Sequence, residues 1–154
     1  MQKLLVVGLL LGAGMALHAA DAVLGTWHLN VAKSRYDPGP PPKNETRTYR
    51  EENGEIKAVV VTQFKNGNTD SVYYPANYDG KVHPVSGAPD RDGIVMKRLS
   101  EFEAESQITH AGKVIGIARR TVAANGKTMT ITFKGTAVNG DPVNNTAFYD
   151  KQVE

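Results

Sequence analysis

Residues 101–110 read EFEAESQITH, and the character of the side chains changes at every step. Phe102, Ala104 and Ile108 fall on one side of an extended chain, together with Ser106 and His110, while acidic and polar residues fall on the other. A period of two is typical of a β-strand with one buried face. The stretch KTMTITFK at residues 127–134 repeats this pattern with Met129, Ile131 and Phe133. Both stretches therefore predict half-buried strands.

The rest of the chain follows the same pattern between short turn signals. Further strands are predicted at residues 24–30, 45–51, 56–64, 70–78, 81–85, 93–99, 113–122 and 145–151. Asn-Gly or Asp-Gly pairs at 66–67, 79–80, 92–93, 125–126 and 139–140 suit tight hairpins. No helices are predicted that could cover the sheet. A sheet without such cover protects its exposed edge strands best by closing into a barrel. We predict an all-β fold, a single antiparallel meander of 8–10 strands closed into a barrel.

The first twenty residues have the anatomy of a signal peptide. Lys3 precedes an apolar run at residues 4–17, which is shorter than the roughly 20 residues that a membrane-spanning helix needs. We predict a signal peptide helix at residues 1–20 and a barrel domain at 21–154, although cleavage after Ala22 fits the sequence rules as well. The expected location is the periplasm or the exterior of a Gram-negative cell. No membrane span is expected after cleavage.

Composition narrows the range of functions. The 18 basic and 16 acidic residues are interleaved, whereas a nucleic-acid-binding protein gathers its basic residues on one face. The chain has no cysteine, and His28, His83 and His110 lack the spacing of metal ligands, so no metal site is predicted. Phosphate-binding and dinucleotide-binding motifs need a strand that leads into a helix, so no cofactor is predicted either. The oligomeric state is not indicated.

The opening of the first strand carries a resemblance to known proteins. Gly25-Thr26-Trp27 resembles the Gly-x-Trp signature of lipocalins and related calycin barrels. Residues 24–30 (LGTWHLN), 32–34 (AKS), 38–40 (PGP) and 126–130 (GKTMT) resemble small exported bacterial lipocalin-like proteins, most of them uncharacterised. The resemblance implies that Gly25 and Trp27 close the narrow end of a lipocalin-like barrel. It also implies that a basic residue of a late strand, Arg119 or Arg120, packs over the indole.

Strand alternation also predicts which polar side chains face the barrel interior. Arg120, for example, shares a face with Val114 and Val122. The predicted ligand-binding residues are Tyr74, Tyr78, Arg98, His110 and Arg120. A concave apolar surface with a few convergent polar groups is typical of a ligand pocket.

Three functions fit this pattern. The first is the binding of a small apolar or aromatic molecule by a periplasmic protein. The second is a cofactor-independent lyase or isomerase that acts on a small aromatic compound, with His110 or a tyrosine as the base. The third is a structural or interaction protein of the cell envelope, which would have a packed interior. The volume of the interior cavity separates the third function from the other two.

Overall fold

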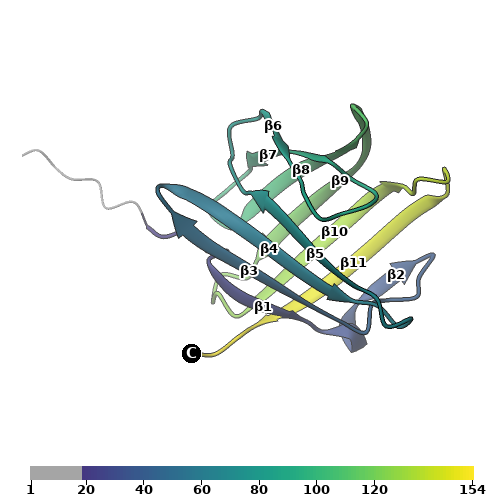
Figure 1. Ribbon diagram of the computed structural model, residues 1–154. Coiled ribbons are helices and arrows are strands. Elements are labelled where there is room, and N and C mark those ends of the chain that lie inside the picture. The colour runs from purple at the N-terminus through teal and green to yellow at the C-terminus, as the bar shows by residue number, and fades with distance from the viewer. Residues whose placement is uncertain (1–18) are drawn as a thin grey trace, which may run out of the picture.

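The chain folds into an antiparallel β-barrel, seen here in a computed structural model that describes residues 19–154 (Figure 1). The predicted signal peptide helix lies outside the described residues. The elements are β1 (Gly25–Leu29), the short 3-10 helix η1 (Val31–Lys33), β2 (Arg35–Asp37), β3 (Asn44–Glu52), β4 (Glu55–Gln63), β5 (Thr69–Pro75), β6 (Val82–Pro84), β7 (Gly93–Arg98), β8 (Glu103–His110), β9 (Lys113–Val122), β10 (Thr128–Thr136) and β11 (Pro142–Lys151). The ten predicted strands are confirmed, and β2 is an additional one.

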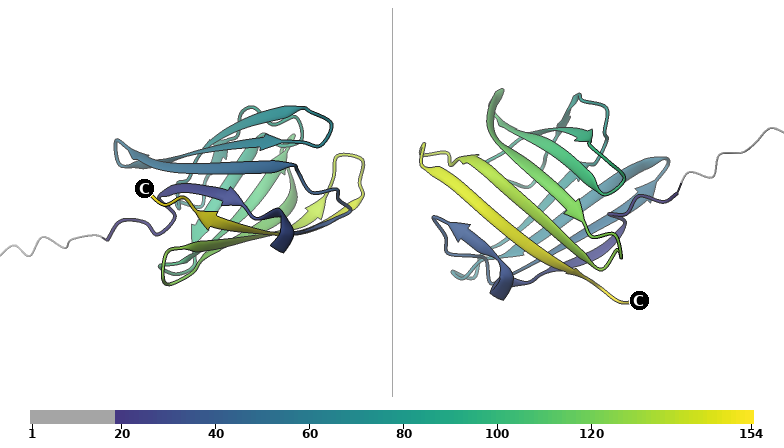
Figure 2. Two further views of the ribbon diagram at one scale, coloured as in Figure 1. Left: turned by 90° about the horizontal axis from the view of Figure 1, so that it is seen from below. Right: turned by 180° about the vertical axis from the view of Figure 1, so that it is seen from behind.

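Hydrogen-bonded neighbours run in the order β5-β4-β3-β1-β11-β10-β9-β8-β7-β6, and β2 pairs with β11 beside this path. From β3 to β5 and from β6 to β11 each strand pairs with the next in the sequence, as a meander does. The β3–β5 layer crosses over the β8–β11 layer, which gives the barrel a flattened outline in the view from below (Figures 1 and 2). No helix within residues 19–154 has both the length and the apolar character needed to span a membrane.

The barrel closes at a narrow seam between β5 and the chain that follows β6. Tyr73 and Ser86 exchange two backbone hydrogen bonds of 3.0 Å and form an isolated bridge there. Gly87 makes this approach possible, because a Cβ atom at this position would lie 1.9 Å from the carbonyl oxygen of Ser71. Strand β5 ends at Pro75, which has no N–H to donate to a further ladder bond.

One end of the barrel is filled by a packed apolar cluster. Its largest members are Trp27 at 0 % exposure, Tyr49, Met129 and Tyr149. The N-terminal segment completes this closed end, since Val23 is fully buried and its carbonyl accepts a 2.8 Å hydrogen bond from the Trp27 indole nitrogen. The opposite, open end is bordered by β2, the β6–β7 loop and the β10–β11 turn, in which Tyr36, Asp90 and Val138 line the cavity.

The cation over Trp27 is Lys151, so the predicted stacking of Arg119 or Arg120 is wrong. Lys151 lies opposite Trp27 in the β1–β11 ladder, and its Nζ is 5.3 Å from the centroid of the indole ring. Gly25 leaves the space for this side chain, because a Cβ on Gly25 would lie 2.7 Å from Cε of Lys151. Arg119 points outward from β9, where it is half exposed and 3.7 Å from Glu103. The Gly-x-Trp opening thus has a direct steric explanation.

Candidate functional site

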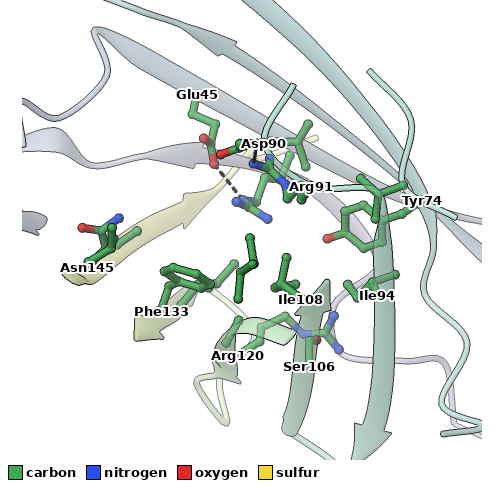
Figure 3. A pocket seen from close by; sticks show the side chains of 18 of the residues that line it. Glu45, Tyr74, Asp90, Arg91, Ile94, Ser106, Ile108, Arg120, Phe133 and Asn145 are labelled. Atoms are coloured by element: carbon green, nitrogen blue, oxygen red, sulfur yellow. Dashed lines mark hydrogen bonds and ion pairs between the residues drawn. The ribbon is translucent and has the colours of Figure 1, made fainter. Parts of the chain in front are cut away.

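The barrel encloses a cavity of about 320 Å³ above the packed closed end. Most of its wall is apolar, including Val60, Ile94, Met96, Ile108, Ile115 and Phe133 (Figure 3). Dry engineered cavities of about 150 Å³ hold one benzene molecule. The space is therefore of the order needed for a two-ring aromatic molecule or a short aliphatic chain.

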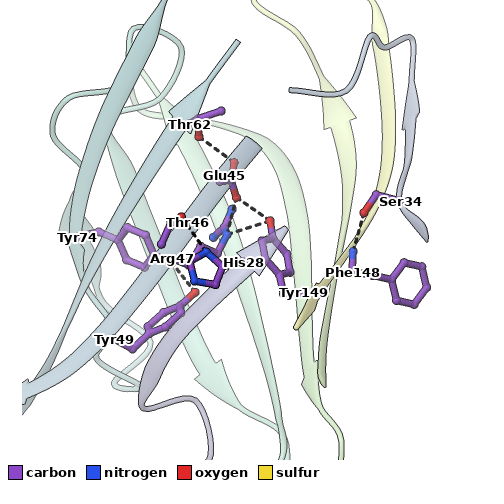
Figure 4. A network of polar contacts seen from close by, with 10 residues as sticks. All are labelled: His28, Ser34, Glu45, Thr46, Arg47, Tyr49, Thr62, Tyr74, Phe148 and Tyr149. Atoms are coloured by element: carbon purple, nitrogen blue, oxygen red, sulfur yellow. Dashed lines mark hydrogen bonds and ion pairs between the residues drawn. The ribbon is translucent and has the colours of Figure 1, made fainter. Parts of the chain in front are cut away.

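A first polar group on the cavity wall, called here the Glu45 cluster, comprises Glu45, Arg47, Thr62 and Tyr149. The Glu45 carboxylate accepts hydrogen bonds from Arg47 Nε at 2.8 Å, from the Tyr149 hydroxyl at 2.6 Å and from the Thr62 hydroxyl at 2.8 Å (Figure 4). Glu45 is 8 % exposed, so the ion pair with Arg47 is almost free of solvent screening. Both carboxylate oxygens have partners, which is what a buried charge requires.

These contacts set the protonation state of the Glu45 cluster. Burial by itself would raise the pKa of Glu45, but Arg47 and the hydroxyls of Tyr149 and Thr62 outweigh it and hold the pKa below its usual value. Burial, with the adjacent Glu45 charge, raises the pKa of the Tyr36 hydroxyl to about 12. The cluster is therefore a stable pair of opposite charges bordered by neutral tyrosines at pH 7.

The Glu45 cluster was missed by sequence reasoning, although its strand was predicted. Glu45, Arg47 and Tyr49 alternate along β3 and all face inward. The other face of the same strand carries Thr46 and Thr48, which are no more apolar. Because both faces of β3 carry polar residues, the alternation does not reveal which face is buried. The position of Tyr49, on the same face as Glu45 and Arg47, is the only indication in the sequence.

A second group, called here the Asp21 cluster, comprises Asp21, Tyr78, Arg98 and Arg120. The Asp21 carboxylate accepts hydrogen bonds from the Tyr78 hydroxyl at 2.8 Å and from Arg98 at 2.5 Å, and Arg120 Nη2 donates to the Tyr78 oxygen. Burial tends to raise the pKa of Asp21, but the Val23 N–H, Tyr78 and Arg98 lower it below its usual value. The cluster ties the N-terminal segment to the barrel.

Four of the five predicted site residues are brought close to one another. Arg120 and Tyr74 line the cavity, and their neighbour Tyr49 links them: the Tyr49 and Tyr74 hydroxyl oxygens are 3.3 Å apart, and the Arg120 guanidinium is 5.5 Å from the Tyr49 ring. Tyr78 and Arg98 lie beside Arg120 but do not line the cavity, and the Arg98 guanidinium is 4.4 Å from the Tyr78 ring. That these residues bind a ligand stays a prediction.

His110 is not among the residues that line the cavity. Strands β8 and β9 change register after Ile108, because Ile108 pairs with Gly116 whereas Thr109 pairs with Val114. Ile115 is left unpaired and faces the cavity, and Val114 is turned outward to 56 % exposure, opposite to its predicted orientation. Such a β-bulge interrupts the alternation along β9 and explains the outward orientation of Val114. His110 ends half buried at the hairpin, and its Nδ1 has no hydrogen-bond partner within residues 19–154.

The cavity tyrosines differ in acidity. Burial would raise the pKa of Tyr49, but the charges of Arg47 and Arg120 and the hydrogen bond with Tyr74 lower it below its usual value. Burial, with Tyr49 next to it, raises the pKa of Tyr74. Among the described residues, no three His, Cys, Asp or Glu side chains are grouped so as to hold a metal ion.

No family model matches the sequence, and no curated protein matches it.

Proposed function

We propose that this protein binds one small apolar or aromatic molecule inside the barrel. The observation that carries the proposal is the cavity of about 320 Å³, whose walls are mainly aliphatic and whose floor holds a few polar groups. A barrel of this size can fill its interior with side chains, and a purely structural protein would gain stability by doing so. An unfilled and mostly apolar space that opens at one end of the barrel supports ligand binding over a structural role.

The proposal is tested by screening neutral two-ring aromatics against the purified protein and measuring the shift in Tm. A ligand present at 100 times its Kd stabilises the folded state by about 2.7 kcal/mol, which raises the Tm by several degrees for a domain of this size. Native mass spectrometry of protein taken from the periplasm would show a ligand that co-purifies. No Tm shift from any apolar probe would contradict the proposal.

Two neighbouring residues of β9 provide a matched pair of variants. Ala118 lines the cavity, whereas Ile117 faces outward and is 38 % exposed. Ala118→Phe should fill the space and abolish the Tm shift caused by the ligand, while Ile117→Phe should retain it. Equal effects of the two substitutions would mean that the probes bind elsewhere.

Tyr49 favours catalysis as a second candidate function. Tyr49 lines the cavity beside two guanidinium groups, which lower its pKa below the usual value and would stabilise an oxyanion. In a lyase or isomerase acting on a small aromatic compound, Tyr49 would replace His110 as the base. Tyr49→Phe should then abolish turnover of a bound compound and leave its affinity nearly unchanged, whereas Tyr73→Phe, outside the cavity, should not affect turnover.

We further propose that the chain is exported to the periplasm or beyond and belongs with the small lipocalin-like proteins that it resembles. The packing of Lys151 over Trp27, in the space left by Gly25, supports the resemblance.

The contacts of Asp21 support cleavage after Ala20, because cleavage after Ala22 would remove the carboxylate partner of Arg98. It would also place a charged amino group on Val23, which is fully buried. The intact mass of the periplasmic protein should equal that of residues 21–154, and the mass of residues 23–154 would contradict this.

A further inference from the structure

The charges that line the cavity do not balance. Its wall carries the carboxylates of Glu45 and Asp90 and the guanidinium groups of Arg47, Arg91 and Arg120. Each carboxylate is already paired with an arginine, Glu45 with Arg47 and Asp90 with Arg91, both at 2.8 Å. One positive charge, that of Arg120, is left over.

Arg120 is buried and has unused hydrogen-bonding capacity. It is 8 % exposed, and no carboxylate oxygen within residues 19–154 lies within 4.0 Å of its guanidinium. Nη2 donates to the Tyr78 oxygen, while Nε is buried without an acceptor and Nη1 donates no hydrogen bond in the part of the chain described. Behind Tyr78 lies Asp21, but that carboxylate is paired with Arg98. A buried guanidinium has five N–H donors, and leaving most of them unused is unfavourable.

Other hydrogen-bond donors line the same cavity. Both hydrogen bonds that Arg47 donates come from Nε, and within residues 19–154 its two terminal nitrogens donate none. Tyr49 and Tyr74 also line the cavity, and their hydroxyl oxygens are 3.3 Å apart. The cavity therefore offers guanidinium and hydroxyl donors beside apolar side chains, among them Arg120 and Tyr74 in Figure 3.

We propose that the ligand is an organic anion, a small aromatic or aliphatic carboxylic acid, whose carboxylate binds to Arg120 at the floor of the cavity. This inference rests on the proposed binding function and adds a charge requirement to it. A carboxylate would pair the excess positive charge and accept a hydrogen bond from Nη1, and charge-assisted bonds of this kind are the strong ones in a low-dielectric site. The hydrocarbon part would lie against the aliphatic walls above.

A pair of isosteric probes tests the charge requirement. We expect 2-naphthoate to bind the wild-type protein about tenfold or more tightly than 2-naphthamide, as measured by isothermal titration calorimetry at pH 7. In Arg120→Met this preference should fall to about onefold, while the affinity for 2-naphthamide changes little. Arg119→Met, next to Arg120 on β9 but outside the cavity, is the matched control and should keep the preference.

The outcomes separate the two proposals. If both probes bind with equal affinity, the anion site is refuted and apolar binding stands. If neither probe binds, both proposals fail. A preference for 2-naphthoate that persists in Arg120→Met would also overturn the assignment, because the anion would then bind elsewhere. If Arg120→Met does not fold, Arg120→Lys can be used, because it keeps the positive charge but lacks the planar guanidinium group. The proposal then requires that the preference for 2-naphthoate be weaker than in the wild type but greater than onefold.

Discussion

The Glu45 cluster and the Asp21 cluster are both buried polar networks, but they are assembled in different ways. The charged members of the first, Glu45 and Arg47, lie two residues apart on β3. Their partners come from strands close by in the sheet, Thr62 from β4 and Tyr149 from β11, which is separated from β3 by β1. The second joins a residue from the N-terminal segment to Tyr78, Arg98 and Arg120, which lie 57, 77 and 99 positions later in the sequence. In the first network every carboxylate oxygen is bonded, whereas Arg120 in the second keeps unused donors. The network whose two charges are paired is therefore interpreted as a structural element, and the one that contains the unpaired Arg120 is the better candidate for binding.

The largest loss of stability should come from breaking the ion pair between Glu45 and Arg47. Arg47→Met leaves Glu45 buried without a cation, and breaking one partner of a buried pair costs about 3–5 kcal/mol. Urea unfolding at pH 7 measures the loss. Arg119→Met, on the outer face of β9, removes only an exposed pair and should cost less than about 1 kcal/mol. Similar losses in the two variants would mean that the Glu45 cluster does not stabilise the fold.

Acidification should weaken the same network more gradually. Since the pKa of Glu45 is lower in the folded protein than in the unfolded chain, its contribution is present in full above about pH 4.3, the ordinary value, and is lost as the pH falls through the folded-state pKa. Asp21, whose pKa is also lowered, acts in the same direction. The free energy of unfolding should therefore fall below about pH 4. Glu45→Gln should show a shallower fall, and a slope identical to that of the wild type would contradict the assignment.

The Asp21 cluster should matter less for stability. Asp21→Asn keeps the shape of the side chain but removes the charge facing Arg98 and Arg120, and we expect a loss of about 1–3 kcal/mol. The loss is limited because the side chain of Arg98 is 41 % exposed and can be solvated by water. Asp141→Asn, in the exposed β10–β11 turn, is the control. Thermal unfolding of both variants gives the comparison, and a loss larger than that of Arg47→Met would reverse the ranking of the two clusters.

The smallest loss of stability is expected from a substitution at the closed end of the barrel. Lys151→Met removes the cation over Trp27 but keeps most of the aliphatic contact, so a loss of about 0.5–1 kcal/mol should follow. Lys127→Met, at an exposed position where no aromatic ring is contacted, should change the Tm by less. Equal Tm values for the two variants would show that the cation adds nothing to the packing of Trp27.

Ten strands could be predicted because hairpins are local. The side chains of Met129, Ile131 and Phe133 alternate with threonines, and an Asn-Gly pair precedes them, so strand and turn are both encoded within about ten residues. Strand β2 was missed because three residues next to a proline-rich segment give no period. The inward orientation of Arg120 and Tyr74 also followed from alternation, which holds wherever the ladder is regular.

Local patterns in the sequence are enough to predict the all-β class, the antiparallel order of the hairpins and the inner face of most strands, because each depends on residues close together in the chain. Only the assembled barrel fixes the seam at Tyr73 and Ser86, the bulge in β9 that turns Val114 outward, the packing of Lys151 over Trp27 and the contact of Asp21 with Arg98. These features depend on the twist and closure of the barrel, which bring together strands that are distant in the sequence. A pattern with a period of two carries no information about such distances.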